Sequence, residues 1–326
     1  MNVVHANQKG IALIVVILML SIIVALTVQF NRASRSAVYD SANMSDGIRL
    51  RYVAKSGFNA AQALLLVNKD NYDTLTQDWA KTDELSAQSE GYFNSGAFRV
   101  IIEDESGKIS VNKLLTGTAV NPVVKEMLIR LLSLPEFRLE PERIQIIIDS
   151  MKDWIDTDNE VTGSGAESDY YKSLDKPYAA KNGPLDTLEE LLMVKGISAD
   201  LYYGTQETPG LEKYLTIYGD GKININTCPK LLFRVLATEI TPGMADEMDR
   251  YRRNVDNYSS LSDPMWYKKI PSMVNISVNP GWITTRSDYF QIFSTGYFQN
   301  MSETVAGAIK RDQSKKTAKL LSWKVY

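Results

Sequence analysis

The chain has 326 residues, and its 36 lysines and arginines are balanced by 39 aspartates and glutamates, which gives a formal net charge of −3 at pH 7. This balance excludes the overall basic character with which many proteins hold nucleic acid. Cys228 is the single cysteine, so no disulfide can form within one chain. A chain of this length has room for several modules with cores of their own.

Residues 11–28 form an uninterrupted apolar segment that begins directly after Lys9 and Gly10. At about 1.5 Å per residue, a helix of this length spans roughly 27 Å, which is about the hydrocarbon thickness of a bilayer. No charged residue interrupts the segment. We therefore expect a membrane-spanning helix almost at the start of the chain.

The residues around this segment indicate how the N-terminus is processed. A secretory signal peptide would have a shorter apolar core, followed by small residues at a cleavage site, whereas Gln29–Asn31 follow the core here. A plain, uncleaved anchor is one alternative. The short leader, residues 1–10, ends in Gln-Lys-Gly and resembles the leader of class III prepilins. That resemblance implies that a prepilin peptidase cuts after Gly10 and methylates the new amine, on Ile11.

One position departs from the common pilin pattern. Most pilins and pseudopilins carry glutamate at the fifth mature position, and that position is Val15 here. A carboxylate inside a bilayer is costly unless a partner neutralises it, so its absence removes one docking interaction with a neighbouring subunit. Among pseudopilins this departure resembles the large minor subunit of type II secretion, the GspK family, which sits at the pilus tip. The alternative interpretation is a membrane anchor improved by valine.

The helical pattern continues beyond the membrane segment. Residues 30–67 contain no proline and place apolar side chains among polar ones, in the pattern of a helix with one buried stripe. A single helix over Ile11–Val67 would be on the order of 85 Å long. Gly47 and Gly57 each cost about 1 kcal/mol relative to alanine, so these are the positions where we expect bends. A coiled-coil stalk is the alternative, but no sustained heptad of large residues supports it.

An internal repeat organises the middle of the chain. Residues 98–112 and 214–226 share a β-rich run, an acidic turn ending in Gly-Lys, and an alternating strand that ends in asparagine. We predict two related helical modules, each entered from a hairpin, with Asn112 and Asn226 capping the helices that follow. The helices are predicted at 123–134, 141–155, 229–238 and 242–253.

These helices resemble helix-hairpin-helix modules. Residues 188–197 resemble the first helix and turn of such a motif, and residues 225–244 resemble its second pattern. In DNA-binding members the backbone amides of the turn hold phosphate, with help from nearby lysines. Only Lys195 is well placed here, so we interpret the pair as small SAM-like modules with a structural role.

The loop after the first module holds the strongest chemical pattern. Asp156, Asp158, Glu160 and Glu167 occupy the first, third, fifth and twelfth positions of a loop, which are oxygen-ligand positions in an EF-hand. The sixth position is Val161 instead of the required glycine, so the loop is not an EF-hand. Packed carboxylates repel one another, and a hard cation such as Ca²⁺ would relieve that repulsion. A solvated acidic loop without metal is the alternative.

Residues 153–196, the SAM-like pair and the last β segments closely resemble the GspK family, and the resemblance covers essentially the whole chain. It implies an α+β fold: a long pilin-like helix packs on an antiparallel sheet, and a large helical insertion with calcium-bound loops interrupts the sheet. The implied calcium ligands are Asp156, Asp158, Glu160, Glu167 and Asp169.

The C-terminal part alternates as a β meander does. Strands are predicted at 289–295, 303–311 and 319–326. We accordingly divide the chain into a prepilin leader (1–10), the membrane part of the long helix (11–28), the rest of that helix with the first strands (29–106), a first inserted helical module with the acidic loop (107–213), a second helical module (214–284) and the C-terminal strands (285–326).

The residue inventory does not favour an enzyme. His5 is the single histidine and lies in the leader, so histidine-based triads and HExxH zinc sites are ruled out in the processed chain. The sequence contains neither a P-loop nor a dinucleotide-binding fingerprint. A carboxylate pair for glycoside hydrolysis has nothing pointing to it.

We therefore interpret the chain as a non-enzymatic minor pseudopilin at the tip of a type II secretion pseudopilus. The resemblance implies a single-pass protein of the bacterial inner membrane with its C-terminal domain in the periplasm. It would initiate or cap assembly and support export of folded proteins across the outer membrane. The implied partners are the minor pseudopilins of the I and J classes, the major pseudopilin and the prepilin peptidase, and nucleic acid is not among them. Two alternatives are a DNA-binding minor pilin of a competence or type IV pilus system and an uncleaved, membrane-anchored calcium-binding adaptor.

Overall fold

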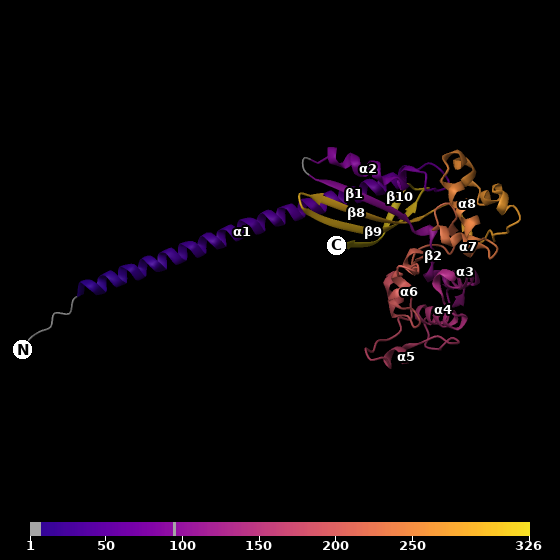
Figure 1. Cartoon of the computed structure of the whole chain (residues 1–326), viewed down its shortest axis with the longest axis horizontal. Coiled ribbons are helices and arrows are strands. Elements are labelled where there is room, and N and C mark those ends of the chain that lie inside the picture. The colour runs from indigo at the N-terminus through magenta and orange to yellow at the C-terminus, as the bar shows by residue number, and fades with distance from the viewer. Residues whose placement is uncertain (1–7, 94–95) are drawn as a thin grey trace, which may run out of the picture.

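The computed structural model describes residues 8–93 and 96–326. Most of the predicted leader, residues 1–7, lies outside the described part. Helix α1 (Gln8–Val67) is one continuous helix that projects far beyond the rest of the molecule (Figure 1). The long helix predicted from Ile11 to Val67 is thus confirmed.

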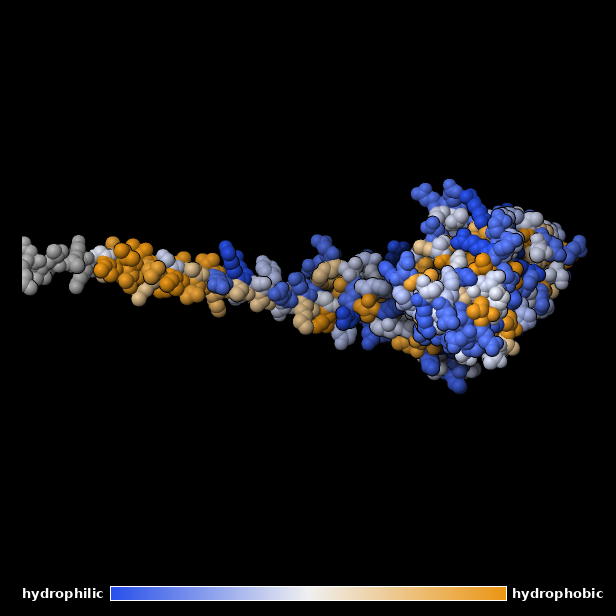
Figure 2. All heavy atoms as spheres, turned by 90° about the horizontal axis from the view of Figure 1, so that it is seen from below, coloured by the Kyte–Doolittle hydropathy of each residue, from blue (hydrophilic) through white to orange (hydrophobic). Residues whose placement is uncertain are grey.

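The outer half of α1 has the properties of a membrane segment. Its most apolar window has a mean hydropathy of 3.2, and 0% of that window is buried within the molecule. Figure 2 shows this apolar half projecting away from the head, by which we mean the inner half of α1, the sheet and the insertion. By length and composition the helix can cross a membrane.

The inner half of α1 packs on a four-stranded antiparallel sheet. Its strands are β1 (Ala97–Asp104), β8 (Tyr289–Phe298), β9 (Met301–Asp312) and β10 (Thr317–Val325), in the order β1-β8-β9-β10. The three predicted C-terminal strands are confirmed. Strand β1 pairs with β8, which follows almost two hundred residues later in the chain, so the sheet closes around a large insertion.

A compact apolar core joins α1 to the sheet. The buried residues of this core include Val53, Phe58, Ala61 and Leu65 from α1 and Val100, Phe290, Ile292, Val305 and Ile309 from the strands. Helix α2 (Thr82–Gln88) lies against β1. Only one stripe of α1 enters this core, which is the pattern expected for an amphipathic helix.

The helix runs without a break through both glycines at which bends were expected. Gly57 instead permits a close approach to the sheet, because a Cβ atom added there would lie 2.7 Å from Phe98 Cγ and would also clash with Ser294 Oγ. A Cβ atom at Gly47 would meet no atom within 4 Å. The two glycines therefore have different physical roles.

The insertion is a helical region with short strands. Its helices are α3 (Pro122–Leu132), α4 (Pro141–Ile155), α5 (Ser168–Lys172), α6 (Ala199–Tyr203), α7 (Phe233–Leu236) and α8 (Pro242–Arg253). Its two-residue strands are β2 (Ile109–Ser110), β3 (Leu115–Thr116), β4 (Ala119–Val120), β5 (Leu215–Thr216), β6 (Ile223–Asn224) and β7 (Ile283–Thr284). Short 3₁₀ helices connect these elements, among them Leu188–Met193, which was predicted as part of a hairpin motif, and Val255–Ser262. One continuous cluster of buried apolar side chains runs through both predicted modules, so they share a core.

The predicted entry hairpins are wrong. Strand β2 pairs in parallel with β5, where Ile109 lies opposite Leu215, and β6 pairs in parallel with β7. The first repeat copy therefore pairs with the second copy instead of folding back on itself. After each of the matched Gly-Lys turns, the chain thus enters a short strand that pairs in parallel with a strand from later in the sequence.

The predicted caps are also wrong. Helix α3 is capped by Asn121, which accepts a hydrogen bond from the Val123 amide at 3.0 Å. The Asn112 side chain donates to the carbonyls of Leu185 and Ile217 at 3.0 and 3.1 Å. The side chain of Asn226 likewise donates to carbonyls of segments distant in sequence. Buried carbonyls without other partners are costly, so these amides serve tertiary contacts.

Substitution at the two glycines of α1 tests the close packing against the sheet. We expect Gly57→Ala to lower the free energy of unfolding of the head by about 1–3 kcal/mol, because the added methyl overpacks the core. Gly47→Ala is the matched control and should be neutral or stabilising by up to about 1 kcal/mol, because alanine favours the helix. Thermal unfolding of the full chain in detergent measures both, and equal effects of the two changes would contradict the assigned packing.

Candidate metal centre

Helix α4 and the residue that caps its C-terminus, Asp156, place three carboxylates along one side. Asp149, Asp153 and Asp156 follow one another at helical spacings of four and three residues, so their side chains share a face. They are 4%, 0% and 7% exposed. Buried carboxylates require hydrogen bonds or a counter-charge. The loop after α4 supplies hydrogen bonds, and Lys152 on α4 supplies one positive charge.

The glycine-rich part of this loop lies directly on the acidic face. The Ser164 amide donates to Asp149 Oδ2 at 3.0 Å, and the Thr162 amide donates to Asp153 Oδ1 at 3.1 Å. A Cβ atom at Gly165 would clash with the Asp153 carboxylate and lie 2.9 Å from the Thr162 carbonyl. The late glycines of the loop, which do not fit an EF-hand, thus allow the backbone to approach the carboxylates closely.

Three of the carboxylates converge. One oxygen from each of Asp153, Asp156 and Glu167 lies within 4.8 Å of the others, and all three residues are buried. Among the described residues, Asp156 Oδ1 and both carboxylate oxygens of Glu167 have no hydrogen-bond partner. Such buried acceptors need a donor or a cation, so the cluster fits a bound metal ion.

The local charge is not balanced by the protein. Lys152 Nζ lies 2.7 Å from Asp156 Oδ2 and 2.6 Å from Thr162 Oγ1, which places one ammonium beside three carboxylates. Burial raises the pKa of Glu167 to about 7, and the neighbouring Asp153 and Asp156 add to this effect. Burial also raises the pKa of Asp153. An all-oxygen set of ligands that carries excess negative charge suits a hard divalent cation such as Ca²⁺.

Lys195 contacts the acidic loop but is not part of the carboxylate cluster. Lys195 Nζ donates to the carbonyls of Ser164 and Gly165 at 3.1 and 3.0 Å and lies over the Tyr170 ring at 4.8 Å from its centroid. The backbone amide of Lys195 donates to the Tyr171 hydroxyl at 3.2 Å. The lysine that sequence analysis considered for phosphate binding therefore contacts the acidic loop.

The structure brings together only part of the predicted ligand set. Asp156 and Glu167 belong to the converging cluster, whereas Asp158, Glu160 and Asp169 are exposed and lie outside it. Asp158 Oδ1 accepts a hydrogen bond from the Glu160 amide at 2.8 Å, which shapes the outer turn of the loop.

Asp153 is not among the predicted ligands, because it lies in the predicted helix 141–155 and not in the acidic loop. The available signal was its position three residues before Asp156, near the end of a predicted helix whose apolar face is formed by isoleucines. A polar residue buried at such a position indicates a site on that face of the helix.

Both the sequence and the fold resemble those of known proteins. A family model described as type II secretion system (T2SS), protein K, matches residues 107–218. Type II secretion system protein K of Klebsiella pneumoniae is 26% identical over 87% of this chain and 86% of the relative. The protein K of Pseudomonas aeruginosa is 25% identical over 95% of this chain and 91% of the relative.

The fold has a solved counterpart. A chain in the crystal structure of the GspK-GspI-GspJ complex from the type 2 secretion system of enterotoxigenic Escherichia coli matches with a TM-score of 0.69 at 19% identity. The match covers 88% of this chain and 99% of that chain. Together with the sequence matches, it confirms the resemblance to the GspK family: the chain is similar to type II secretion system protein K over nearly its whole length.

Proposed function

We propose that this chain is a non-enzymatic minor pseudopilin at the tip of a type II secretion pseudopilus, where it initiates or caps assembly and supports export of folded proteins across the outer membrane. The observation that carries the proposal is the shape of the molecule. The exposed apolar half of α1 (Figure 2) continues into a half that packs on the antiparallel sheet (Figure 1). The similarity to protein K of type II secretion systems supports it.

The membrane half of α1 defines the starting position of the chain. Ile14 and Leu18 are 67% and 58% exposed, and such side chains need an apolar environment. Before assembly the chain is a single-pass protein of the inner membrane, with its head in the periplasm. A prepilin peptidase cuts after Gly10 and methylates Ile11, so that this apolar helix becomes the N-terminus. Within the pseudopilus the same surface packs against partner helices.

The insertion supports the tip position. Its helices lie beside the sheet and at the end opposite the apolar half of α1 (Figure 1). A subunit added above would have to occupy this volume, so the chain has subunits only below it. Val15 agrees with this position, because a subunit without the usual membrane carboxylate forms one docking interaction fewer.

The partners follow from the assembly. The solved complex that matches this fold contains GspI and GspJ, so we expect minor pseudopilins of the I and J classes as immediate neighbours. The major pseudopilin forms the shaft below them. Nucleic acid is not a partner, since Lys195, the basic residue nearest the first helix-hairpin-helix-like turn, is engaged with the acidic loop.

The tip position can be tested by labelling. We expect an epitope tag in the exposed turn at residues 279–281, away from the acidic cluster, to appear at one end of isolated pseudopili. We also expect the export of a folded substrate to depend on this chain. The measurements are immunogold microscopy and a secretion assay in a strain that lacks the chain, with and without complementation. Label spread along the shaft, or normal export without the chain, would contradict the proposal.

We further propose that the candidate centre binds a structural Ca²⁺ ion through Asp153, Asp156 and Glu167. A bound cation would neutralise the carboxylates and hold the loop against α4, and no chemical step depends on it. The buried acceptors of Glu167 without a partner support this assignment. Asp149 and Lys195 position the loop from either side.

Glu167→Gln separates a metal ligand from a purely structural carboxylate. In wild type we expect calcium at a hundred times Kd to add about 2.7 kcal/mol of stability relative to chelator. Glu167→Gln should lose most of this gain, yet be at least as stable as wild type in chelator, because it removes a buried, unpaired charge. Thermal unfolding with calcium and with chelator measures both.

The matched control is Asp169→Asn, which lies two residues further on, is exposed, and should keep the full calcium effect. Equal stability of the wild type with calcium and with chelator would refute the metal assignment. A calcium gain that Glu167→Gln keeps would remove Glu167 from the ligand set.

A further inference from the structure

Strand β10 forms a free edge of the sheet. Its neighbour on one side is β9, and no other strand among the described residues pairs with its second side. Tyr326 and Thr304 exchange both backbone hydrogen bonds, at 2.9 and 3.2 Å. Because such pairs alternate along an antiparallel ladder, the amides and carbonyls of Trp323 and Val325 point to the outer edge. This edge offers unpaired donors and acceptors to a further strand.

The edge is also unusually apolar. Exposed fractions are 48% for Leu320, 37% for Trp323, 43% for Val325 and 68% for Tyr326. Natural edge strands are commonly short, bent or covered, because an open edge invites pairing. Here the strand has nine residues, and its one register shift, between Leu320 and Ser322, leaves the last part regular. The last part of β10 therefore has the features of a docking strand.

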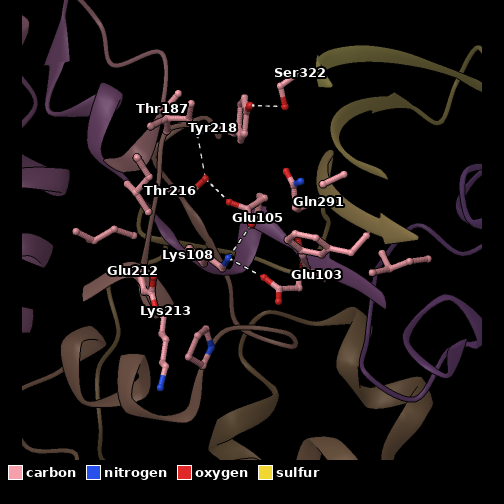
Figure 3. Close-up of a pocket in the computed structure, with 18 of the residues that line it drawn as sticks. Glu103, Glu105, Lys108, Thr187, Glu212, Lys213, Thr216, Tyr218, Gln291 and Ser322 are labelled. Atoms are coloured by element: carbon pink, nitrogen blue, oxygen red, sulfur yellow. Dashed lines mark hydrogen bonds and ion pairs between the residues drawn. The ribbon is translucent and has the colours of Figure 1, made fainter. Parts of the chain in front are cut away.

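The insertion contacts β10 from the face of the sheet that lies opposite α1. A cleft of about 760 Å³ separates the sheet from the insertion, and Figure 3 shows the side chains that line it. Across this cleft the Tyr218 hydroxyl bonds to Ser322 Oγ at 3.2 Å, and Lys324 Nζ lies 3.9 Å from Glu189. A strand that is held in place loses little entropy when it binds a partner.

The charge of the hairpin formed by β9 and β10 indicates what kind of partner strand fits the edge. Exposed lysines surround the edge, at positions 315, 316, 319 and 324. Lys319 lies directly opposite Lys310 on β9, a like-charge pair that costs stability. Asp312 pairs with Lys315 at 3.4 Å. In a chain whose net charge is −3, this positive edge complements an acidic partner.

A second copy of the chain fits poorly. If two β10 strands paired antiparallel about Leu321, Lys319 of each would lie opposite Trp323 of the other, and Lys324 opposite Ala318. The strand contains no aspartate or glutamate, so two positively charged edges would meet without a carboxylate between them, and like charges brought close together are destabilising. A partner with aspartate or glutamate on an extended edge strand would instead pair with these lysines.

We infer that the outer edge of β10 docks an acidic edge strand of another minor pseudopilin, extending the sheet across the subunit boundary. The inference rests on the proposed function, because that function supplies the partner. The backbone of Trp323 and Val325 provides the hydrogen bonds, the apolar side chains provide contact area, and the lysines select the partner.

The test uses the full chain in detergent, co-expressed and co-purified with the I-class and J-class minor pseudopilins of the same secretion system. Val325→Pro removes an outward amide while leaving the ladder to β9 intact, and we expect about a tenfold or greater loss of complex. Val325→Thr keeps the amide and the branched shape, so it should bind as wild type does. Matching thermal unfolding of the two free variants checks that the fold is intact.

Hydrogen exchange gives a direct readout of the same edge. The amides of Trp323 and Val325 should become protected when the complex forms, whereas the Lys324 amide, which faces β9, is already protected. The double variant Lys316→Glu, Lys319→Glu should weaken the complex and make its formation less sensitive to salt. If these lysines only prevent unwanted pairing of the edge and have no docking role, the double variant should bind as the wild type does.

The outcomes separate the two proposals. If Val325→Pro still forms the complex, and the amides of Trp323 and Val325 in the wild-type complex still exchange, the docking edge is overturned and the proposed function stands. Failure of the wild type to bind either minor pseudopilin overturns the proposed function and the inference with it.

Discussion

The arrangement of the head depends on one buried ion pair. Arg311 on β9 and Asp73, which follows α1, are 0% and 1% exposed, and their side chains meet at 2.6 Å. The guanidinium also donates to the carbonyls of Leu65 and Ser287 at 3.2 and 2.5 Å. A buried pair is weak evidence for net stability, since desolvation offsets much of the attraction. Loss of one partner would leave an uncompensated charge, at a cost of about 3–5 kcal/mol. The pair therefore fixes geometry, because it ties the end of α1, β9 and the segment entering β8 to one another.

The same network holds both chain crossings into the insertion. Asn226 donates to the Asp73 carbonyl at 3.1 Å, and the Ser287 amide donates to Asp73 Oδ2 at 2.8 Å. Asp104, where β1 ends, accepts hydrogen bonds from the Thr227 and Ser287 hydroxyls, and burial raises the pKa of this carboxyl to about 7. The chain thus leaves and re-enters the sheet beside one polar cluster. The direction of the insertion relative to α1 follows from it, and with that direction come the positions of the candidate metal centre and of the free β10 edge.

The predictability of these features follows the range of the interactions. The long helix, α4, α8 and the three C-terminal strands have strong periodicity or clear proline starts, so local sequence predicts them. The predicted hairpins and asparagine caps were wrong because the two-residue strands pair with, and the buried side-chain amides donate to, segments far away in the chain. Asp153 was not predicted because it converges with Glu167, which belongs to a loop whose path the sequence does not give. The Asp73–Arg311 pair joins residues 238 positions apart and has no local signal.

Processing of the N-terminus is the most direct test of the account, because an assembled pseudopilin needs its apolar helix at the new end of the chain. The measurement is intact mass and N-terminal peptide mass of the protein from membranes of strains with and without prepilin peptidase. The account predicts a chain that begins at N-methylated Ile11 only where the peptidase is present. An intact Met1 in both strains, or a cut behind residue 28, would contradict it and leave an anchored or secreted adaptor.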